Sequence, residues 1–300
     1  MNREHLQQQF GIPQRVRFAE GRGGLTRVEL QHVSGARSEV YLHGAHVTAW
    51  QPAREREVLF VSSASHFRDG APIRGGIPVI FPQFGDGPLP KHGLVRTRAW
   101  TVERTALGAD GAVMLTLRLE DDAQTRACWP HPFSLQLTVS LGLDLALDFT
   151  VTNPGPAPLP FQAVLHTYFQ VGAIAQTGLS GLQGTAFDDF LNPGPAAAPR
   201  AEARAIVEFD RETDLVYINA PDRVVLDDRG NQRKITIVKS GLSDIVVWNP
   251  WIEKSKRLDD FGDDEYQRMV CVETGCIRAP PALAPGAQWS GRTSFACENG

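Results

Sequence analysis

The sequence has few cysteines and no long apolar segment. Its 300 residues contain only Cys128, Cys271, Cys276 and Cys297, without the paired spacing of a zinc finger. We therefore expect free thiols in a reducing cytoplasm. No run approaches the roughly 18 apolar residues of a membrane span, and the N-terminal segment MNREHLQQQFGIP lacks the apolar stretch of a signal peptide. We expect no membrane partner.

The sequence also lacks a basic excess and the common cofactor motifs. Its net charge of −4 argues against non-specific nucleic-acid binding, which needs a basic surface. It contains no GxSxG, P-loop, HExxH or strand-linked GxGxxG motif. His43 and His46 would lie on opposite faces of a strand, which disfavours a joint metal site. We predict no metal and no cofactor, and the absence of a long apolar stripe predicts a monomer.

What the sequence does contain is a repeated strand pattern. Apolar residues alternate with polar ones in segments typical of half-buried antiparallel strands. The segments are 25–30, 39–42, 113–119, 134–141 and 143–151, and two more strands are expected near the C-terminus, at 270–272 and 289–295. Helical patterns are scarce, and we expect short helices only at 1–10 and 251–261. We expect residues 178–200 to form a surface loop. The pattern predicts an all-β chain of two antiparallel sheets packed face to face, forming a single domain over residues 1–300.

The segment from Arg74 to Arg96, RGGIPVIFPQFGDGPLPKHGLVR, stands apart from the strands. Its glycines and prolines are too dense for a helix or a long strand, yet it is too apolar for a solvated loop. We expect it to be a buried loop that lines a pocket. Arg74 and Arg96 could offer bidentate forks to a phosphate or carboxylate, and Lys91 could add a third cation. Each of these residues could instead form an ordinary salt bridge.

Two side chains could transfer protons. His166 lies in AVLHTYF, among apolar and aromatic residues, and an imidazole can give or take a proton near neutral pH. It could equally be a core histidine bonded to a backbone carbonyl. Glu273 ends the apolar strand MVCVE, where partial burial would raise its pKa and make it a better base. A solvent-facing carboxylate is the alternative.

A third group of residues suits sugar binding. Asp214 stands at the start of the strand LVYIN, where it could accept hydrogen bonds from hydroxyl groups or be an ordinary turn acid. Trp248 and Trp251 flank Asn249-Pro250 and could stack on a sugar ring, although core packing is the commoner role.

These segments together resemble the aldose 1-epimerase superfamily, in particular its branch of D-hexose-6-phosphate mutarotases. The matching segments occur in the family's order along nearly the whole chain. They are HGAHVTAW (43–50), RGGIPVIFPQFG (74–85), PKHGLVR (90–96), LHTYF (165–169), ETDLVY (212–217), VVWNPW (246–251) and VCVETG (270–275). The resemblance implies an antiparallel β-sandwich of the galactose mutarotase-like kind, called a supersandwich, with few short helices and a site on its concave face.

The resemblance also implies roles for single residues. It makes His166 the general acid and Glu273 the general base of a ring opening. For that chemistry a histidine and a glutamate on opposite sides of the sugar ring would suffice. The resemblance makes Arg74 and Arg96 phosphate ligands and Asp214 a ligand of the hydroxyls. Gln83 and His92 fall in matching motifs and are expected to line the pocket. Lys91 stands where many members have glutamine, so its role is open.

The implied activity is the interconversion of α and β anomers of hexose 6-phosphates, with glucose 6-phosphate as the expected substrate. Acid and base catalysis alone would suffice for it. The alternatives are a non-catalytic sugar-phosphate binding protein on the same scaffold, a mutarotase of unphosphorylated aldoses, and a glycoside hydrolase. A hydrolase would need a second carboxylate, which Asp214 would have to supply.

Overall fold

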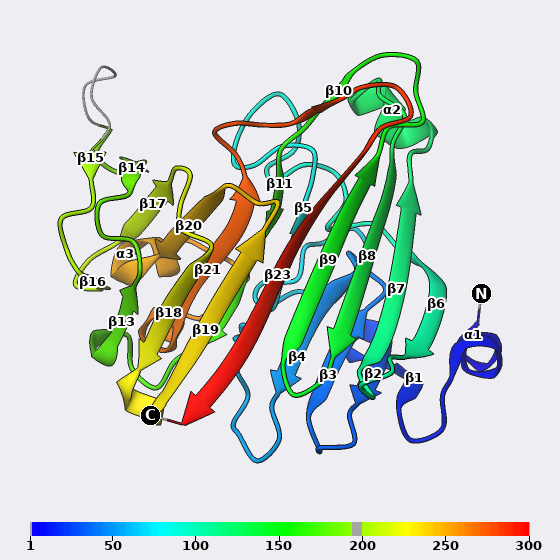
Figure 1. The fold of residues 1–300 in the computed structure, drawn as a ribbon, viewed down its shortest axis with the longest axis horizontal. Coiled ribbons are helices and arrows are strands. Elements are labelled where there is room, and N and C mark those ends of the chain that lie inside the picture. The colour runs from blue at the N-terminus through cyan, green and yellow to red at the C-terminus, as the bar shows by residue number, and fades with distance from the viewer. Residues whose placement is uncertain (1, 194–199, 300) are drawn as a thin grey trace.

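The computed structural model describes residues 2–193 and 200–299, and nearly all of its regular structure is antiparallel β-sheet. The largest sheet contains nine strands, which lie at the front of Figure 1. In spatial order they are β16 (Ile206–Glu208), β13 (Thr177–Ser180), β18 (Arg223–Asp228), β19 (Arg233–Ser240), β23 (Gln288–Asn299), β9 (Leu145–Thr152), β8 (Ser134–Leu141), β7 (Val113–Glu120) and β6 (Thr101–Leu107).

A second layer packs against this sheet and is built from two smaller sheets. One has four strands: β1 (Val16–Glu20), β2 (Thr26–Gln31), β3 (Arg37–Tyr41) and β4 (His46–Gln51). The other has eight: β15 (Arg200–Ala201), β14 (Ala186–Asp189), β17 (Thr213–Tyr217), β20 (Asp244–Asn249), β21 (Met269–Cys276), β11 (Ala163–Leu165) and β5 (Val79–Ile80), with β12 (Tyr168–Gln170) also paired to β21. The two strands β10 (Leu159–Pro160) and β22 (Ala282–Leu283) form a separate pair.

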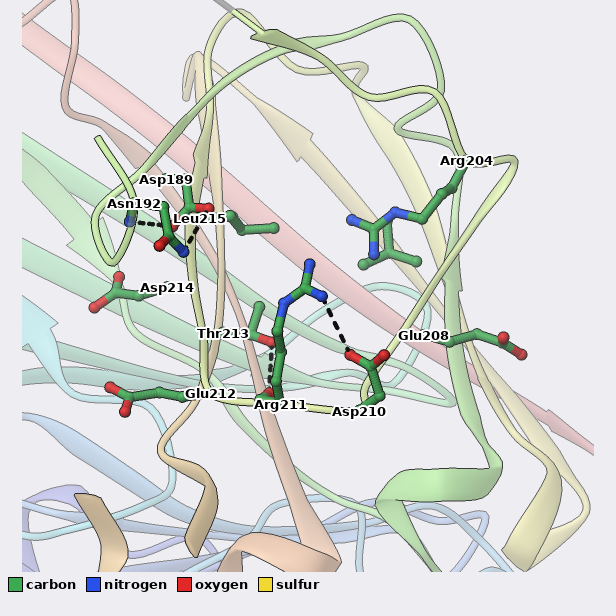
Figure 2. A pocket seen from close by; sticks show the side chains of 11 residues that line it. Asp189, Asn192, Arg204, Glu208, Asp210, Arg211, Glu212, Thr213, Asp214 and Leu215 are labelled. Carbon is green, nitrogen blue, oxygen red and sulfur yellow. Dashed lines mark hydrogen bonds and ion pairs between the residues drawn. The ribbon is translucent and has the colours of Figure 1, made fainter. Parts of the chain in front are cut away.

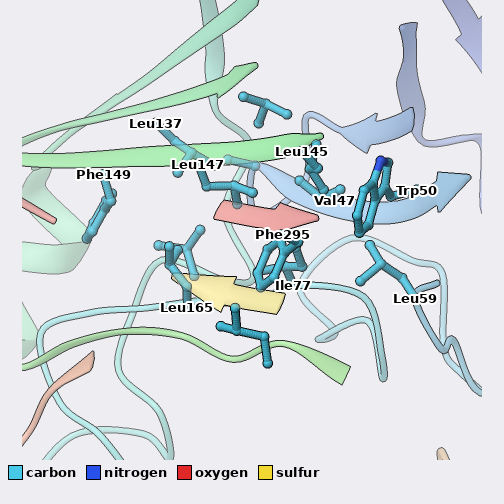
Figure 3. Close-up of a cluster of buried hydrophobic side chains, with 14 of the residues drawn as sticks. Val47, Trp50, Leu59, Ile77, Leu137, Leu145, Leu147, Phe149, Leu165 and Phe295 are labelled. Carbon is cyan, nitrogen blue, oxygen red and sulfur yellow. The ribbon is translucent and has the colours of Figure 1, made fainter. Parts of the chain in front are cut away.

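The core lies between the two layers. Along β8 every second residue is buried, as the alternation in the sequence predicts. Figure 3 shows Leu137, Leu147 and Phe149 of the nine-stranded sheet meeting Val47 and Leu165 of the second layer. The expected β-sandwich is therefore confirmed.

Helices are few and short, as expected. The α-helices are α1 (Arg3–Phe10), α2 (Ala123–Cys128) and α3 (Trp251–Ser255), and 3₁₀ turns cover Arg22–Gly24, Ile174–Gln176, Arg229–Asn231 and Glu265–Arg268. The helix expected over 251–261 ends at Ser255, because the chain continues in separate turns in which Leu258 and Phe261 donate to the carbonyls three residues before them. Within the described residues, no helix is long and apolar enough to cross a membrane.

The expectation of a surface loop over 178–200 was wrong. This range contains most of β13 and all of β14, and β15 begins at its last residue, Arg200. The composition hides β13 because its sequence, TGLS, is too short to alternate. The strand is held by pairing with β16 on one side and β18 on the other. Residues 194–199 of the expected loop lie outside the described residues.

Candidate active site

The register of the eight-stranded sheet turns a set of reactive side chains away from the core between the layers. Val270 and Val272 of β21 belong to that core, so Cys271 and Glu273 point to the opposite face. On the neighbouring strand β20, Trp248 lies opposite Cys271. We call this surface, which faces away from the nine-stranded sheet, the outer face.

His166 meets Glu273 on the outer face. His166 lies in the gap between β11 and β12, where its backbone N–H donates to the carbonyl of Pro78. Its Nδ1 atom is 3.3 Å from Oε1 of Glu273, and the two residues are only 7% and 1% exposed. Its ring stacks on Tyr168 with centroids 4.7 Å apart. Nδ1 has no hydrogen-bond partner among the described residues.

Burial moves the pKa values of the two groups in opposite directions. It raises the pKa of Glu273 well above its ordinary value, and the charge of Asp214 adds to the effect. Burial also lowers the pKa of His166 well below its ordinary value, and His92, Arg74 and Arg96 add to that shift. A neutral carboxyl group beside a neutral imidazole holds one transferable proton, which belongs to the pair rather than to either residue.

The segment 74–96 lies beside this pair. It is apolar and buried as predicted over residues 75–83, where Val79–Ile80 form the edge strand β5 paired with β11, but residues 86–88, 90 and 91 are exposed. Gly75 and Gly76 have φ values of 115° and 61°, and a Cβ atom at Gly76 would lie 2.2 Å from the carbonyl oxygen of Val47. Only glycine fits such a position without strain. The carbonyl of Gly76 accepts from Tyr168 N–H, so the loop backbone is hydrogen-bonded to the strand that follows His166.

Arg74 is held rigidly at the start of this loop. Its Nε donates to Oδ1 of the buried Asp260 at 3.0 Å, and its Nη1 donates to the Tyr168 hydroxyl at 3.2 Å. Burial opposes its charge, but Tyr168 and Asp260 more than offset this, so the pKa of Arg74 rises. The side chain is therefore a fixed cation, and its Nη2 donates no hydrogen bond to any of the described residues.

Arg96 is a second cation close enough to affect the same groups. Its Nη2 donates to the backbone carbonyl of Lys91 at 2.9 Å, and no carboxylate of the described residues forms an ion pair with it. Burial lowers the pKa of Arg96, and the charge of Arg74 lowers it further. A guanidinium beside another cation and without a carboxylate partner is well suited to an anion.

The other predicted loop residues differ in their surroundings. The amide of Gln83 bonds to the loop backbone, donating to the carbonyls of Gly85 and Leu89 and accepting from Leu89 N–H. It thus shapes the loop, and it also lines a hollow with Trp129 that is separate from His166. Lys91 is exposed and pairs with Asp86 at 3.2 Å.

His92 packs directly against the proton-transfer pair. Its ring meets that of His166 edge to face, with centroids 5.4 Å apart, and contacts Phe84 on its other side at the same distance. Burial lowers the pKa of His92 to about 3, and the charges of Arg96 and Lys91 contribute, so its ring is neutral near pH 7. It therefore supports the position of His166 without carrying charge.

Asp214 lies on the outer face at the end of the sheet nearer β14. Its Cα pairs with that of Trp248, and Oδ2 is 3.7 Å from Nζ of Lys254, which also binds Glu212 at 2.9 Å. Burial raises the pKa of Asp214. In Figure 2 the carboxylates of Asp214 and Glu212 point to the same side, away from the guanidinium of Arg211, and both residues help to line the hollow drawn there.

Sequence reasoning missed three residues of this arrangement. Tyr168 lies in the quoted segment LHTYF but was given no role, although it both stacks on His166 and bonds to Arg74. Asp260 stands in an acidic turn with nothing local to single it out. Cys271 could have been found, because it is two residues from Glu273 on a strand and so shares its face.

Comparison with known proteins shows the family of this chain. Residues 26–296 match the sequence family described as aldose 1-epimerase. The chain belongs to this family. The name "Putative glucose-6-phosphate 1-epimerase" is carried by a relative from Cenchrus ciliaris, 36% identical over 91% of this chain and 84% of its own length, and by one from Escherichia coli, 37% identical over 78% and 77%.

The fold of this aldose 1-epimerase family member is also that of solved relatives. A crystal structure from Salmonella typhimurium, described as a "putative mutarotase (YeaD)", superimposes with a TM-score of 0.86 and 30% identity over 95% of this chain and 94% of that one. A second structure, of the protein HI1317, has a TM-score of 0.78 at 24% identity over 96% and 97%, which shows the fold alone.

Proposed function

We propose that this chain is an isomerase that interconverts the α and β anomers of hexose 6-phosphates, with glucose 6-phosphate as the substrate. The observation that carries this proposal is the buried contact between His166 and Glu273, 3.3 Å apart on the outer face. Membership of the aldose 1-epimerase family and the names of the two relatives support it. Neither residue would be needed as a proton donor or base in a protein that only binds sugar.

Mutarotation requires two proton transfers at one end of the sugar. The hydroxyl oxygen O1 loses a proton and the ring oxygen O5 gains one, while the C1–O5 bond breaks and a C1–O1 double bond forms. Rotation about C1–C2 and the reverse steps give the other anomer. O1 and O5 are bonded to the same carbon, so two adjacent protein groups can reach both oxygens. His166 and Glu273 are neighbours, 3.3 Å apart, and would therefore act from one side of the sugar ring and not from opposite sides as expected.

The shared proton connects the observed geometry with the expected roles. Transfer from Glu273 to Nδ1 of His166, once the 3.3 Å separation has closed to a hydrogen bond, would give an imidazolium beside a carboxylate. The imidazolium then donates from Nε2 to O5, and the carboxylate accepts the proton of O1. Positioned proton transfer of this kind contributes about 10²–10⁴-fold for each group. Ring closure returns both protons, so the pair is restored and no cofactor is consumed.

The two arginines supply the proposed phosphate contacts. Within the part of the chain that the structure describes, Arg96 has no carboxylate partner and Nη2 of Arg74 donates no hydrogen bond, while Asp260 and Tyr168 hold the rest of the Arg74 guanidinium. Binding a remote phosphate would hold the sugar while its reactive end opens and turns. Lys91, His92 and Asp214 would complete the pocket, Asp214 as an acceptor for sugar hydroxyls, whereas the expected role of Gln83 as a pocket residue is replaced by one in shaping the loop.

Optical rotation of freshly dissolved α-glucose 6-phosphate tests the proposal. The protein should speed the approach to the equilibrium rotation well beyond the buffer rate. A rate equal to the buffer blank, together with measurable binding of the sugar phosphate, would favour the non-catalytic binding protein. Release of reducing sugar from an aryl glycoside would favour the hydrolase.

Three further expectations belong to this proposal. The core cluster includes residues from Leu6 to Phe295, which supports a single domain over 1–300. The free cysteines of the described chain support a reducing cytoplasmic location. We also propose that the protein acts as a monomer, without a nucleic-acid or membrane partner.

A further inference from the structure

A third metal-binding type of side chain lies beside the proton-transfer pair. Cys271 is two residues before Glu273 on β21 and points to the same face. One ligand atom from each of His166, Cys271 and Glu273 lies within 4.8 Å of the others, and all three residues are buried. The proposed isomerisation uses the histidine and the glutamate but gives the thiol no part.

The polar atoms in this cluster are not satisfied by the protein. Nδ1 of His166 and Oε2 of Glu273 are buried and have no hydrogen-bond partner among the described residues. Their residues are only 7% and 1% exposed. Buried polar atoms are normally paired, and unpaired ones at a cluster of ligand-type groups point to a ligand.

The spacing also fits a small tetrahedral cation. Zinc binds imidazole nitrogen and carboxylate oxygen at about 2.0–2.1 Å, which places two such atoms about 3.3 Å apart in a tetrahedral site. The observed distance from Nδ1 of His166 to Oε1 of Glu273 is 3.3 Å. A thiolate at about 2.3 Å would lie about 3.6 Å from the other two ligand atoms, so from a spacing of up to 4.8 Å the Cys271 sulfur would have to move inward by at most about 1.2 Å on binding.

The charges balance as well. A divalent cation held by one thiolate, one carboxylate and one neutral imidazole leaves no net charge in a site that already faces Arg74 and Arg96. Thiolate and imidazole ligands select zinc-like ions over magnesium or calcium, which prefer oxygen.

We propose that His166, Cys271 and Glu273 form a three-ligand site for a thiophilic divalent cation of the Zn²⁺ class, and that the bound ion inhibits the protein. The ion would take the lone pairs that the pair needs for proton transfer, so binding and isomerisation exclude each other. The inhibition rests on the proposed function, whereas the binding does not. The ion is proposed as an inhibitor and not as a cofactor, so the prediction that catalysis needs no metal is unchanged.

Cobalt absorbance tests the binding without any measurement of activity. Metal-free protein titrated with Co²⁺ should develop a sulfur-to-cobalt charge-transfer band that Zn²⁺ abolishes. Cys271→Ser should lose this band and bind Zn²⁺ at least about tenfold more weakly. Cys276→Ser is the matched control, because its thiol lies on the same strand but contacts the carbonyl of Ala163, and it should keep the band.

Two outcomes would overturn the site. The wild-type protein could show no sulfur-to-cobalt band, or Cys271→Ser could keep the band unchanged. Circular dichroism confirms that each variant is folded, and Cys271→Ala serves as a second variant should serine disturb the apolar cluster. In the activity arm, Zn²⁺ should slow anomer exchange, a chelator should restore it, and Cys271→Ser should be at least about tenfold less sensitive.

Discussion

Nδ1 of His166 lies 3.3 Å from Oε1 of Glu273, although His166 directly follows β11 and Glu273 lies within β21, more than 100 residues later, where the strand continues to Cys276 instead of ending at Glu273 as expected. The contact depends on two features of the fold. Strand β21 is central in the eight-stranded sheet and buries Glu273 on the outer face, and the break between β11 and β12 turns His166 toward it. A pair buried in this way is costly to keep, which suggests that it is retained for chemistry rather than for stability.

Glu273→Gln should stabilise the protein more at pH 8 than at pH 5. Burial raises the pKa of Glu273, so the folded state holds a proton that the unfolded state releases above its ordinary pKa of 4.5. Between these two pKa values stability falls as pH rises, because the unfolded state binds fewer protons. Glutamine has the shape of the neutral carboxyl group and does not titrate, so the variant does not lose stability in this way as pH rises. The increase in the free energy of unfolding caused by Glu273→Gln should therefore be larger at pH 8 than at pH 5 by more than about 1 kcal/mol. Urea unfolding at both pH values measures it, and an equal gain at both contradicts the burial argument.

Arg96→Ala should separate phosphate binding from ring opening. Removing the guanidinium should raise the KM for glucose 6-phosphate by about 10–100-fold, since a charge-assisted bond contributes roughly 1.5–3 kcal/mol. Activity toward glucose should change little. Arg223→Ala, at an exposed arginine that bonds to Thr236 on the nine-stranded sheet, is the control. Equal losses for both sugars from Arg96→Ala would remove the claim of phosphate recognition.

Asp260→Asn should act through Arg74. The carboxylate of Asp260 fixes Nε of Arg74 at 3.0 Å, so the variant should leave the guanidinium poorly oriented and raise the KM for glucose 6-phosphate. We expect this effect to disappear when Arg74 is already alanine, because residues in one network are not additive. A double-mutant cycle on kcat/KM measures the coupling. Additive effects of Asp260→Asn and Arg74→Ala would show that Asp260 only supports the fold.

Lys91→Gln should have a small effect. The ammonium is exposed and paired with the exposed Asp86, and such pairs contribute at most about 1 kcal/mol. We therefore expect the KM for glucose 6-phosphate to rise by no more than about fivefold. A loss as large as that of Arg96→Ala would instead make Lys91 a main phosphate ligand.

Periodicity and composition predicted the sandwich and the buried loop. Alternation along 134–141 follows directly from one-sided burial, and the glycines of 74–96 serve positive φ values and close backbone contacts. Short paired segments such as β13 were missed because their partners, not their own pattern, hold them in the sheet.

The candidate site could be predicted only in part. Both His166 and Glu273 were singled out from local sequence, but their contact was not, because nothing local fixes a distance between segments that meet through sheet register. Asp260 stayed hidden for the same reason, since it acts only through Arg74.

Exchange between the anomers of glucose 6-phosphate, followed by NMR magnetisation transfer at equilibrium, tests the central claim most directly. Wild-type protein should exchange the two anomeric signals far faster than buffer alone. Folded His166→Ala and Glu273→Gln should each lose at least about 10²-fold of that rate. Exchange at the buffer rate with wild-type protein, or full exchange with either variant, would contradict the account.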